Sequence, residues 1–245
     1  MRKILVIMAA LFCTQVGAQA QTHASDVVAA ADGGELRIVF LGHGSVAFEY
    51  DGRHVYVDPV AEYADFGRMP KADLILVTHE HGDHLDAGAI EALWQEELVG
   101  FGSATAVEAF GAGEVLRHGE RRELGYVTVE AVPAYNVSPE RQNFHPKARL
   151  HNGYILTFGG TRVYVAGDSE DTPEMLALRD VDIAFLPVNL PYTMTEEQAA
   201  RAVRAMRPTI FYPYHYGGTD HTTDLAKLAK LIEGSGAEMR IRPLE

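Results

Sequence analysis

The chain has 245 residues, of which 47% are hydrophobic, and its 21 basic and 34 acidic side chains give a formal net charge of −13. A chain of this length can bury a substantial core as one domain. Its acidity repels polyanions, which argues against nucleic acid or an anionic membrane surface as partner and favours a small-molecule substrate.

The N-terminus has the pattern of a secretory signal peptide. A basic start at Arg2 and Lys3 precedes an apolar stretch over residues 4–12, and a small-residue motif ends at Ala20. Because this stretch is too short to span a bilayer, we expect residues 1–20 to be removed, no stable membrane anchor to remain, and the mature protein to be periplasmic or secreted. Cys13 is the single cysteine and lies inside this peptide, so the mature chain would have neither a disulfide nor a thiolate metal ligand.

The predicted elements then follow in an alternating order. Residues 21–35 show no clear period, so we expect a flexible mature N-terminus before a single domain over residues 36–245. Strands are expected at 37–41, 45–50 and 53–58, with the hairpin dipeptide Asp51-Gly52 between the last two. Later strand patterns lie at 74–77, 126–132, 154–158, 161–166, 181–187 and 209–214, and helical patterns at 87–97, 104–110, from Thr195 to before Pro208, and at 224–232. This order predicts an α/β layered fold with two sheets and outer helices.

The strand at 74–77 leads directly into a dense group of metal-binding residue types. The segment after it reads T-H-E-H-G-D-H and contains His79, His81, Asp83 and His84. Imidazole and carboxylate together suit zinc, or manganese or iron, better than calcium or magnesium. In an extended segment His79 and His81 point to one side, and a turn at Gly82 would direct Asp83 and His84 elsewhere, which allows two neighbouring metal positions. The alternative is a solvated, histidine-rich loop.

T-H-E-H-G-D-H resembles the H-x-H-x-D-H signature of the metallo-β-lactamase fold hydrolases, and the similarity extends from about Ile38 to the C-terminus. It is closest to the uncharacterised metal-dependent hydrolases related to the ascorbate-6-phosphate lactonases. The resemblance implies a four-layer αββα sandwich. It also implies that Asp168, in Ala-Gly-Asp-Ser, bridges two metals and that His215 is the closing histidine. Asp83, His84, Asp168 and His215 would then surround the second metal position.

The first metal position departs from the common pattern of that family. His79 and His81 need a third ligand, and Asn136, in V-P-A-Y-N, stands where a histidine is expected. Asparagine is a poor zinc ligand, whereas His145, in N-F-H-P, is close enough in sequence to replace it. Asn136 and His145 are therefore the candidates for a first-site or substrate ligand, and the number of bound ions, one or two, stays open.

Two further residues are candidates for an outer layer that orients the ligands. His43, in G-H-G-S between two strands, could orient a ligand carboxylate or could be a packed turn histidine. Asp58, at the end of the strand over 53–58, is the other candidate. A structural or solvated role is expected for His23, His54, His118 and His151, and either a pocket or a solvent-exposed position for His221.

The chemistry expected of such a site is hydrolysis. A divalent ion lowers the pKa of bound water from 15.7 to about 7, and Asp83 could accept the proton of that water as the catalytic residue. The sequence therefore predicts a metal-dependent hydrolase of a small ester-like substrate: a lactone, an amide or a phosphodiester. Competing hypotheses are a non-catalytic metal- or partner-binding protein, a true β-lactamase, and an iron-dependent redox protein. The sequence does not indicate an oligomeric state.

Overall fold

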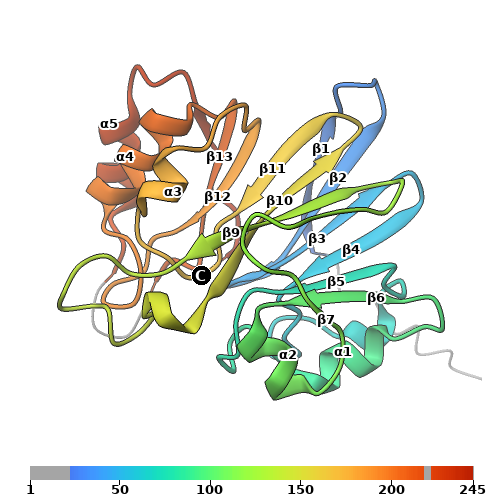
Figure 1. The fold of residues 1–245 in the computed structure, drawn as a ribbon. Helices are drawn as coiled ribbons and strands as arrows, with labels where there is room; N and C mark the ends of the chain where they lie inside the picture. Colours follow the sequence, from blue (N-terminus) through green and yellow to red (C-terminus); the bar gives the residue numbers. More distant parts are fainter. Residues whose placement is uncertain (1–22, 218–221, 245) are drawn as a thin grey trace, which may run out of the picture.

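The computed structural model describes residues 23–217 and 222–244, so the expected signal peptide and His221 lie outside the described residues. Two seven-stranded sheets pack face to face, and the helices cover their outer faces. Figure 1 shows α1 and α2 beside the first sheet and α3, α4 and α5 beside the second. The predicted αββα layer order is thus confirmed.

The first sheet contains its strands in chain order. They are β1 Ala24–Ala29, β2 Glu35–Gly42, β3 Ser45–Tyr50, β4 Arg53–Val57, β5 Leu74–Val77, β6 Val99–Gly102 and β7 Glu114–Val115. Pairing is antiparallel from β1 to β4 and parallel from β4 to β7. The connections include the 3₁₀ helix η1 Phe66–Arg68 and the helices α1 Ala87–Leu93 and α2 Ala104–Phe110. Asp51 and Gly52 both have positive φ, as a two-residue hairpin turn of this type requires.

The second sheet has the order β14-β13-β12-β11-β10-β9-β8. Its strands are β8 Arg121–Glu123, β9 Thr128–Ala134, β10 His151–Phe158, β11 Thr161–Val165, β12 Ile183–Pro187, β13 Ile210–Tyr214 and β14 Glu238–Met239. The strands from β11 to β14 are parallel. The helices are η2 Lys147–Arg149, α3 Pro173–Leu176, α4 Glu196–Met206 and α5 Leu225–Ile232. The predicted capping box at Thr195 is present, with Gln198 as its partner.

The main core lies between the two sheets. Alternate side chains of each strand point inward, so that Phe40 and Phe48 of the first sheet meet Phe185 and Tyr212 of the second. Each of these side chains is almost completely buried, and such burial stabilises a fold by about 2 kcal/mol per side chain. Smaller apolar clusters hold the helices on each outer face.

Two expectations about the elements are wrong. Residues 24–29 were expected to be loose, but they form β1, which pairs with β2 from Ala24 opposite Phe40 to Ala29 opposite Glu35. The carboxylate of Asp26 also accepts hydrogen bonds from Tyr212 (2.6 Å) and Arg242 (2.8 Å). Polar contacts and strand pairing therefore hold this segment, although its sequence shows no apolar period. The helix expected over 87–97 ends at Leu93.

The topology brings several strand ends to one edge of the sandwich. The loops after β4, β5, β11, β12 and β13 all begin at the carboxyl ends of parallel strands, where α/β folds place their ligands. These loops carry Asp58, the histidine-rich segment, Asp168, Asn189 and His215. Within residues 23–217 and 222–244, none of the helices combines the length and apolarity needed to cross a bilayer.

Candidate metal centre

Asp58 organises the loop that follows β5. Its buried carboxylate accepts the backbone N–H of Thr78 (2.7 Å), the hydroxyl of Thr78 (2.7 Å) and Nδ1–H of His84 (2.8 Å). The Thr78 hydroxyl also contacts Nδ1 of His79 at 2.9 Å. With the Nδ1 atoms held this way, the Nε2 lone pairs of His79 and His84 are free to act as metal ligands.

The charges around His84 reflect this arrangement. Burial lowers the pKa of His84, but the carboxylates of Asp168 and Asp58 outweigh it and leave the pKa well above the usual value. Burial raises the pKa of Asp58. The structure therefore places Asp58 where an outer-layer residue was expected, in contact with one candidate ligand and, through Thr78, with another.

The second position is surrounded by His43, Asp83, His84 and His215, whose ligand atoms lie within 4.8 Å of one another. His215 Nε2 lies 3.5 Å from Asp83 Oδ2. His43 Nε2 lies 3.3 Å from the same oxygen, and its ring centroid is 3.7 Å from that of His215. His43 thus contacts a candidate ligand carboxylate, as its expected outer-layer role requires.

His215 is oriented by Asn189. His215 Nδ1 lies 3.2 Å from the Asn189 amide, and with the amide oxygen facing the ring, the amide nitrogen donates to the carbonyl oxygens of Gly217 (2.6 Å) and Leu190 (3.1 Å). This assignment satisfies every polar atom of the Asn189 side chain and leaves His215 Nε2 facing Asp83 and Asp168.

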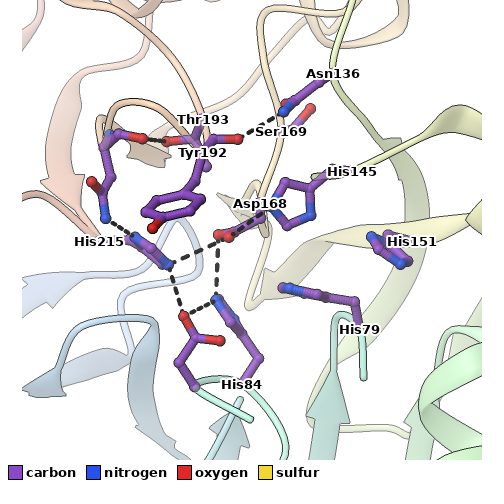
Figure 2. A network of polar contacts seen from close by, with 12 residues as sticks. His79, His84, Asn136, His145, His151, Asp168, Ser169, Tyr192, Thr193 and His215 are labelled. Carbon is purple, nitrogen blue, oxygen red and sulfur yellow. Dashed lines mark hydrogen bonds and ion pairs between the residues drawn. The ribbon is translucent and has the colours of Figure 1, made fainter. Parts of the chain in front are cut away.

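Asp168 lies between the two positions. Its Oδ1 is 3.3 Å from His84 Nε2, and its Oδ2 is 3.3 Å from His145 Nε2 and 3.4 Å from His215 Nε2 (Figure 2). Burial raises its pKa, but His215 and His84 outweigh burial and hold the pKa well below the usual value. A carboxylate in this place can contact an ion at either position.

The first position is completed by His145. The ligand atoms of His79, His81 and His145 lie within 4.8 Å of one another. Asn136, the other candidate, is directed elsewhere, since its Nδ2 donates to the carbonyl oxygens of Arg141 (3.0 Å) and Tyr192 (2.7 Å) (Figure 2). The structure thus brings His145, and not the side chain of Asn136, to His79 and His81.

A buried glutamate that the sequence gave no reason to select supports the loop before His145. The Glu170 carboxylate accepts the backbone N–H groups of Val137 (2.7 Å) and Ser138 (2.5 Å) and pairs with the guanidinium of Arg141. Burial raises the pKa of Glu170, but these hydrogen bonds outweigh it and leave the pKa below the usual value. Glu170 therefore fixes the loop that carries His145.

His151, for which a structural or solvated role was expected, lies beside the first position. Its ring is almost fully buried, and its centroid is 4.8 Å from that of His79. Its Nε2 lies 3.1 Å from a carboxylate oxygen of Glu80, at an ion-pair distance but without the alignment of a hydrogen bond. Burial lowers the pKa of His151 to about 4. The sequence has no motif that would predict the proximity of His151 to His79.

The turn at Gly82 does not use the conformational freedom of glycine. Its φ is not among the positive values of the chain, and a Cβ at this position would meet no atom within 4 Å. The expectation that glycine is needed to separate Asp83 and His84 from the first two histidines is therefore wrong. Hydrogen bonds from the backbone N–H groups of His84 and Leu85 to the His81 carbonyl oxygen close the turn instead.

The unpaired buried atoms of the cluster fit a metal. Within the described residues, His79 Nε2, His84 Nε2, His215 Nε2 and Asp168 Oδ1 are buried and have no hydrogen-bond partner. Buried polar atoms normally have a hydrogen-bond partner, and here four atoms of neighbouring residues lack one, although His84, His215 and Asp168 lie at ion-pair distances from one another. Imidazole nitrogens with carboxylate oxygens form the donor set that zinc and other first-row divalent ions prefer.

The cluster opens into a cavity of about 310 Å³. Besides candidate ligands, its walls include His43, Phe144, Asn189 and Tyr192. A slightly larger cavity, about 360 Å³, lies between α1, α2 and the first sheet, but its lining contains no candidate ligand. The 310 Å³ cavity is therefore the place where a small molecule could meet bound metal.

Comparisons with known proteins agree with this geometry. Residues 37–215 match the beta-lactamase superfamily domain. A UPF0173 metal-dependent hydrolase of Methanopyrus kandleri is 33% identical over 200 residues, which cover 74% of this chain and 84% of that protein. Another, of Deinococcus radiodurans, is 30% identical and covers 84% of this chain and 96% of its own length.

Solved structures show the same relationship. A protein of Parabacteroides distasonis, described as a metal-dependent hydrolase, has 48% identity and a TM-score of 0.87 over 91% of this chain and 100% of its own. The metallo hydrolase Igni18 of Ignicoccus hospitalis has 25% identity and a TM-score of 0.68, over 86% of this chain and 96% of its own. The resemblance seen in T-H-E-H-G-D-H is confirmed: the chain belongs to the β-lactamase superfamily and is a metal-dependent hydrolase of the metallo-β-lactamase fold.

Proposed function

We propose that this hydrolase holds two divalent ions, with zinc the expected metal and manganese or iron the alternatives. His79, His81 and His145 would hold the first, and Asp83, His84 and His215 the second, with Asp168 between them. The proposal rests on the buried Nε2 atoms of His79, His84 and His215, which have no hydrogen-bond partner.

The bound ions and Asp83 would have different roles in hydrolysis. When bound, divalent ions supply Lewis acidity to water and to the bond that is cleaved. Asp83 faces the cavity with 43% of its side chain exposed, and it can accept a proton from the attacking water. Burial alone would raise its pKa, but the contacts with His215 and His43 hold the pKa well below the usual value, so Asp83 is ionised at neutral pH.

The proposed substrate is a small ester-like molecule: a lactone, an amide or a phosphodiester. A cavity of about 310 Å³ is at the lower end of the range for small-molecule sites, roughly 300–1,000 Å³. The approach of His145 to His79 and His81 favours turnover over the non-catalytic hypothesis, because it supplies the ligand that the sequence lacks at Asn136.

Metal content tests the ligand assignment. Protein purified without added metal, and again after chelation and zinc reloading, is expected to contain two equivalents per chain by elemental analysis. His145→Ala is expected to contain one, and His54→Ala, a half-buried histidine of β4 outside the cluster, two. Equal metal content in wild type and His145→Ala would contradict the assignment of His145 to the first position. No metal after reloading, with no turnover of a lactone, an amide and a phosphodiester, would favour a non-catalytic protein.

Export is the remaining part of the proposal. It rests on the sequence of residues 1–20, and the mature protein is expected to begin at Gln21 in the periplasm or medium. Cell fractionation followed by N-terminal sequencing of the recovered protein tests it, and an uncut chain in the cytoplasmic fraction would contradict it.

A further inference from the structure

We infer that Phe144 and Tyr192 form an aromatic clamp, and that this clamp selects substrates whose portion next to the hydrolysed bond is flat, apolar and uncharged. The inference rests on the proposed function, because it names the substrate class of the same cavity. Neither residue belongs to the candidate metal ligands.

The two rings lie together on the wall of the cavity. Their centroids are 5.0 Å apart with an interplanar angle of 76°, the edge-to-face arrangement of an aromatic pair. Both line the cavity that also contains Asp83, Asp168 and His215, and Figure 2 shows the Tyr192 ring beside His215. Tyr192 is 39% exposed, unlike the core aromatics, so burial on folding does not explain its place.

Hydrogen bonds fix the loops that carry the clamp. The amide of Asn136 donates to the carbonyl oxygens of Arg141 and Tyr192, and thus joins the loop of Phe144 to the loop of Tyr192. The Tyr192 backbone N–H also donates to the carbonyl oxygen of Asn189 (2.9 Å). Loops held in this way need little rearrangement when a ligand binds, which favours affinity for a flat group.

The side chains that line the cavity disfavour a substrate with an anionic group away from the hydrolysed bond. Among the described residues the cavity lining contains no lysine or arginine. The cations of the adjoining loop, Arg141 and Lys147, are paired with Glu170 and Glu174. A phosphate or carboxylate away from the metals would find no lysine or arginine partner among the described residues that line the cavity.

Three hydroxamates distinguish these features, because the hydroxamate group binds the metals and the rest of each probe contacts the outer cavity. Calorimetric titration of zinc-loaded protein would use benzohydroxamate, acetohydroxamate and 4-carboxybenzohydroxamate. We expect benzohydroxamate to bind about tenfold or more tightly than acetohydroxamate, since only its ring can pack against the aromatic pair. We expect the added carboxylate of 4-carboxybenzohydroxamate to cancel that gain. Zinc content measured after each titration ensures that the probe has not removed the metal.

Variants assign the selectivity to the two rings. The preference for the phenyl group should fall to about threefold or less in Phe144→Ala and in Tyr192→Ala. It should remain in Tyr192→Phe, which keeps the ring and loses the hydroxyl. Trp94→Ala is the matched control, because Trp94 is an exposed aromatic at the end of α1 and does not line this cavity.

The possible failures are distinguishable. Equal binding of the phenyl and methyl probes to wild type, an unchanged preference in both alanine variants, or tightest binding of the carboxylate would overturn the clamp and leave the proposed hydrolase intact. Binding of none of the probes to zinc-loaded protein would overturn the proposed function, and the clamp with it.

Discussion

The backbone N–H of Asn136 donates to the carbonyl oxygen of His145 over 2.8 Å. Asn136 stands where the family pattern leads one to expect a histidine, and His145 lies beside His79 and His81. The asparagine therefore supports the histidine that takes its place. Its amide also holds the carbonyl oxygens of Arg141 and Tyr192, so one buried side chain connects metal binding with the shape of the cavity.

Asn136→Ala should weaken the first metal position without removing a ligand. Two carbonyl oxygens lose their partner in a partly buried place, which should lower the free energy of unfolding by about 1 kcal/mol. The loop of His145 would be less well positioned, and the affinity for the first ion should fall about tenfold. Competitive chelator titration, which resolves two zinc ions of different affinity, measures this. A uniform loss at both positions would contradict the assignment.

Asp58→Asn should affect the second position more than the first, because Asp58 contacts His84 directly and His79 only through Thr78. The substitution keeps the shape of the side chain but removes the charge that stabilises Nδ1–H of His84. Outer-layer substitutions of this kind lower metal affinity by about 10- to 100-fold. The same titration should show the larger loss at the second ion, while Asp51→Asn, in the exposed hairpin turn after β3, should leave both affinities unchanged. Unaltered zinc binding in Asp58→Asn would show that Asp58 does not orient His84.

Two glycines near the site should respond in opposite ways to the same substitution. A Cβ at Gly44 would lie 2.7 Å from Cε1 of His84, whereas one at Gly82 would meet nothing within 4 Å. Because His84 is completely buried and held by Asp58, its ring cannot move away freely, so Gly44→Ala should lower zinc content at the second position and reduce turnover at least tenfold. Gly82→Ala should retain both, and a loss in that variant would show that the turn does need glycine.

The parts of the fold that the sequence predicted are those with a local signal. The hairpin at Asp51-Gly52 and the capping box at Thr195 follow from neighbouring residues, and the four ligand-type residues after β5 stand together in the chain. β1 was missed because its stability comes from pairing with β2 and from the contact of Asp26 with Arg242, 216 positions away. The strands β7 and β14 have two residues each, too few to show a period.

The missed site residues have no local signal for the same reason. Glu170 acts on Val137, 33 positions away, and Asn189 acts on His215, 26 positions away. Asn136 could be singled out only because a family pattern led to it, and its role became evident only from the loops that it joins. Polar residues of this kind are recognised by burial and by partners, which are properties of the tertiary structure.

His151 gives a prediction for the dependence of stability on pH in the metal-free protein. Burial lowers its pKa from 6.5 to about 4 in the folded state, although Glu80 opposes the shift. Between those two values the unfolded chain binds more protons at this residue than the folded chain does, so the free energy of unfolding should fall as the pH falls from 6.5 to 4. At about 1.4 kcal/mol per pH unit, the loss from this residue amounts to at most about 3–4 kcal/mol.

Other buried histidines titrate in the same protein, so the contribution of His151 has to be measured as a difference. The pKa of His79 is also lowered by burial, whereas that of His84 is raised by its carboxylates, and their effects on stability have opposite signs. Urea denaturation of chelated wild type and His151→Gln at several pH values removes these shared contributions. The wild type should lose stability relative to the variant between pH 6.5 and 4, with no divergence above 6.5. A constant difference between wild type and His151→Gln across that range would show that burial does not suppress protonation of His151.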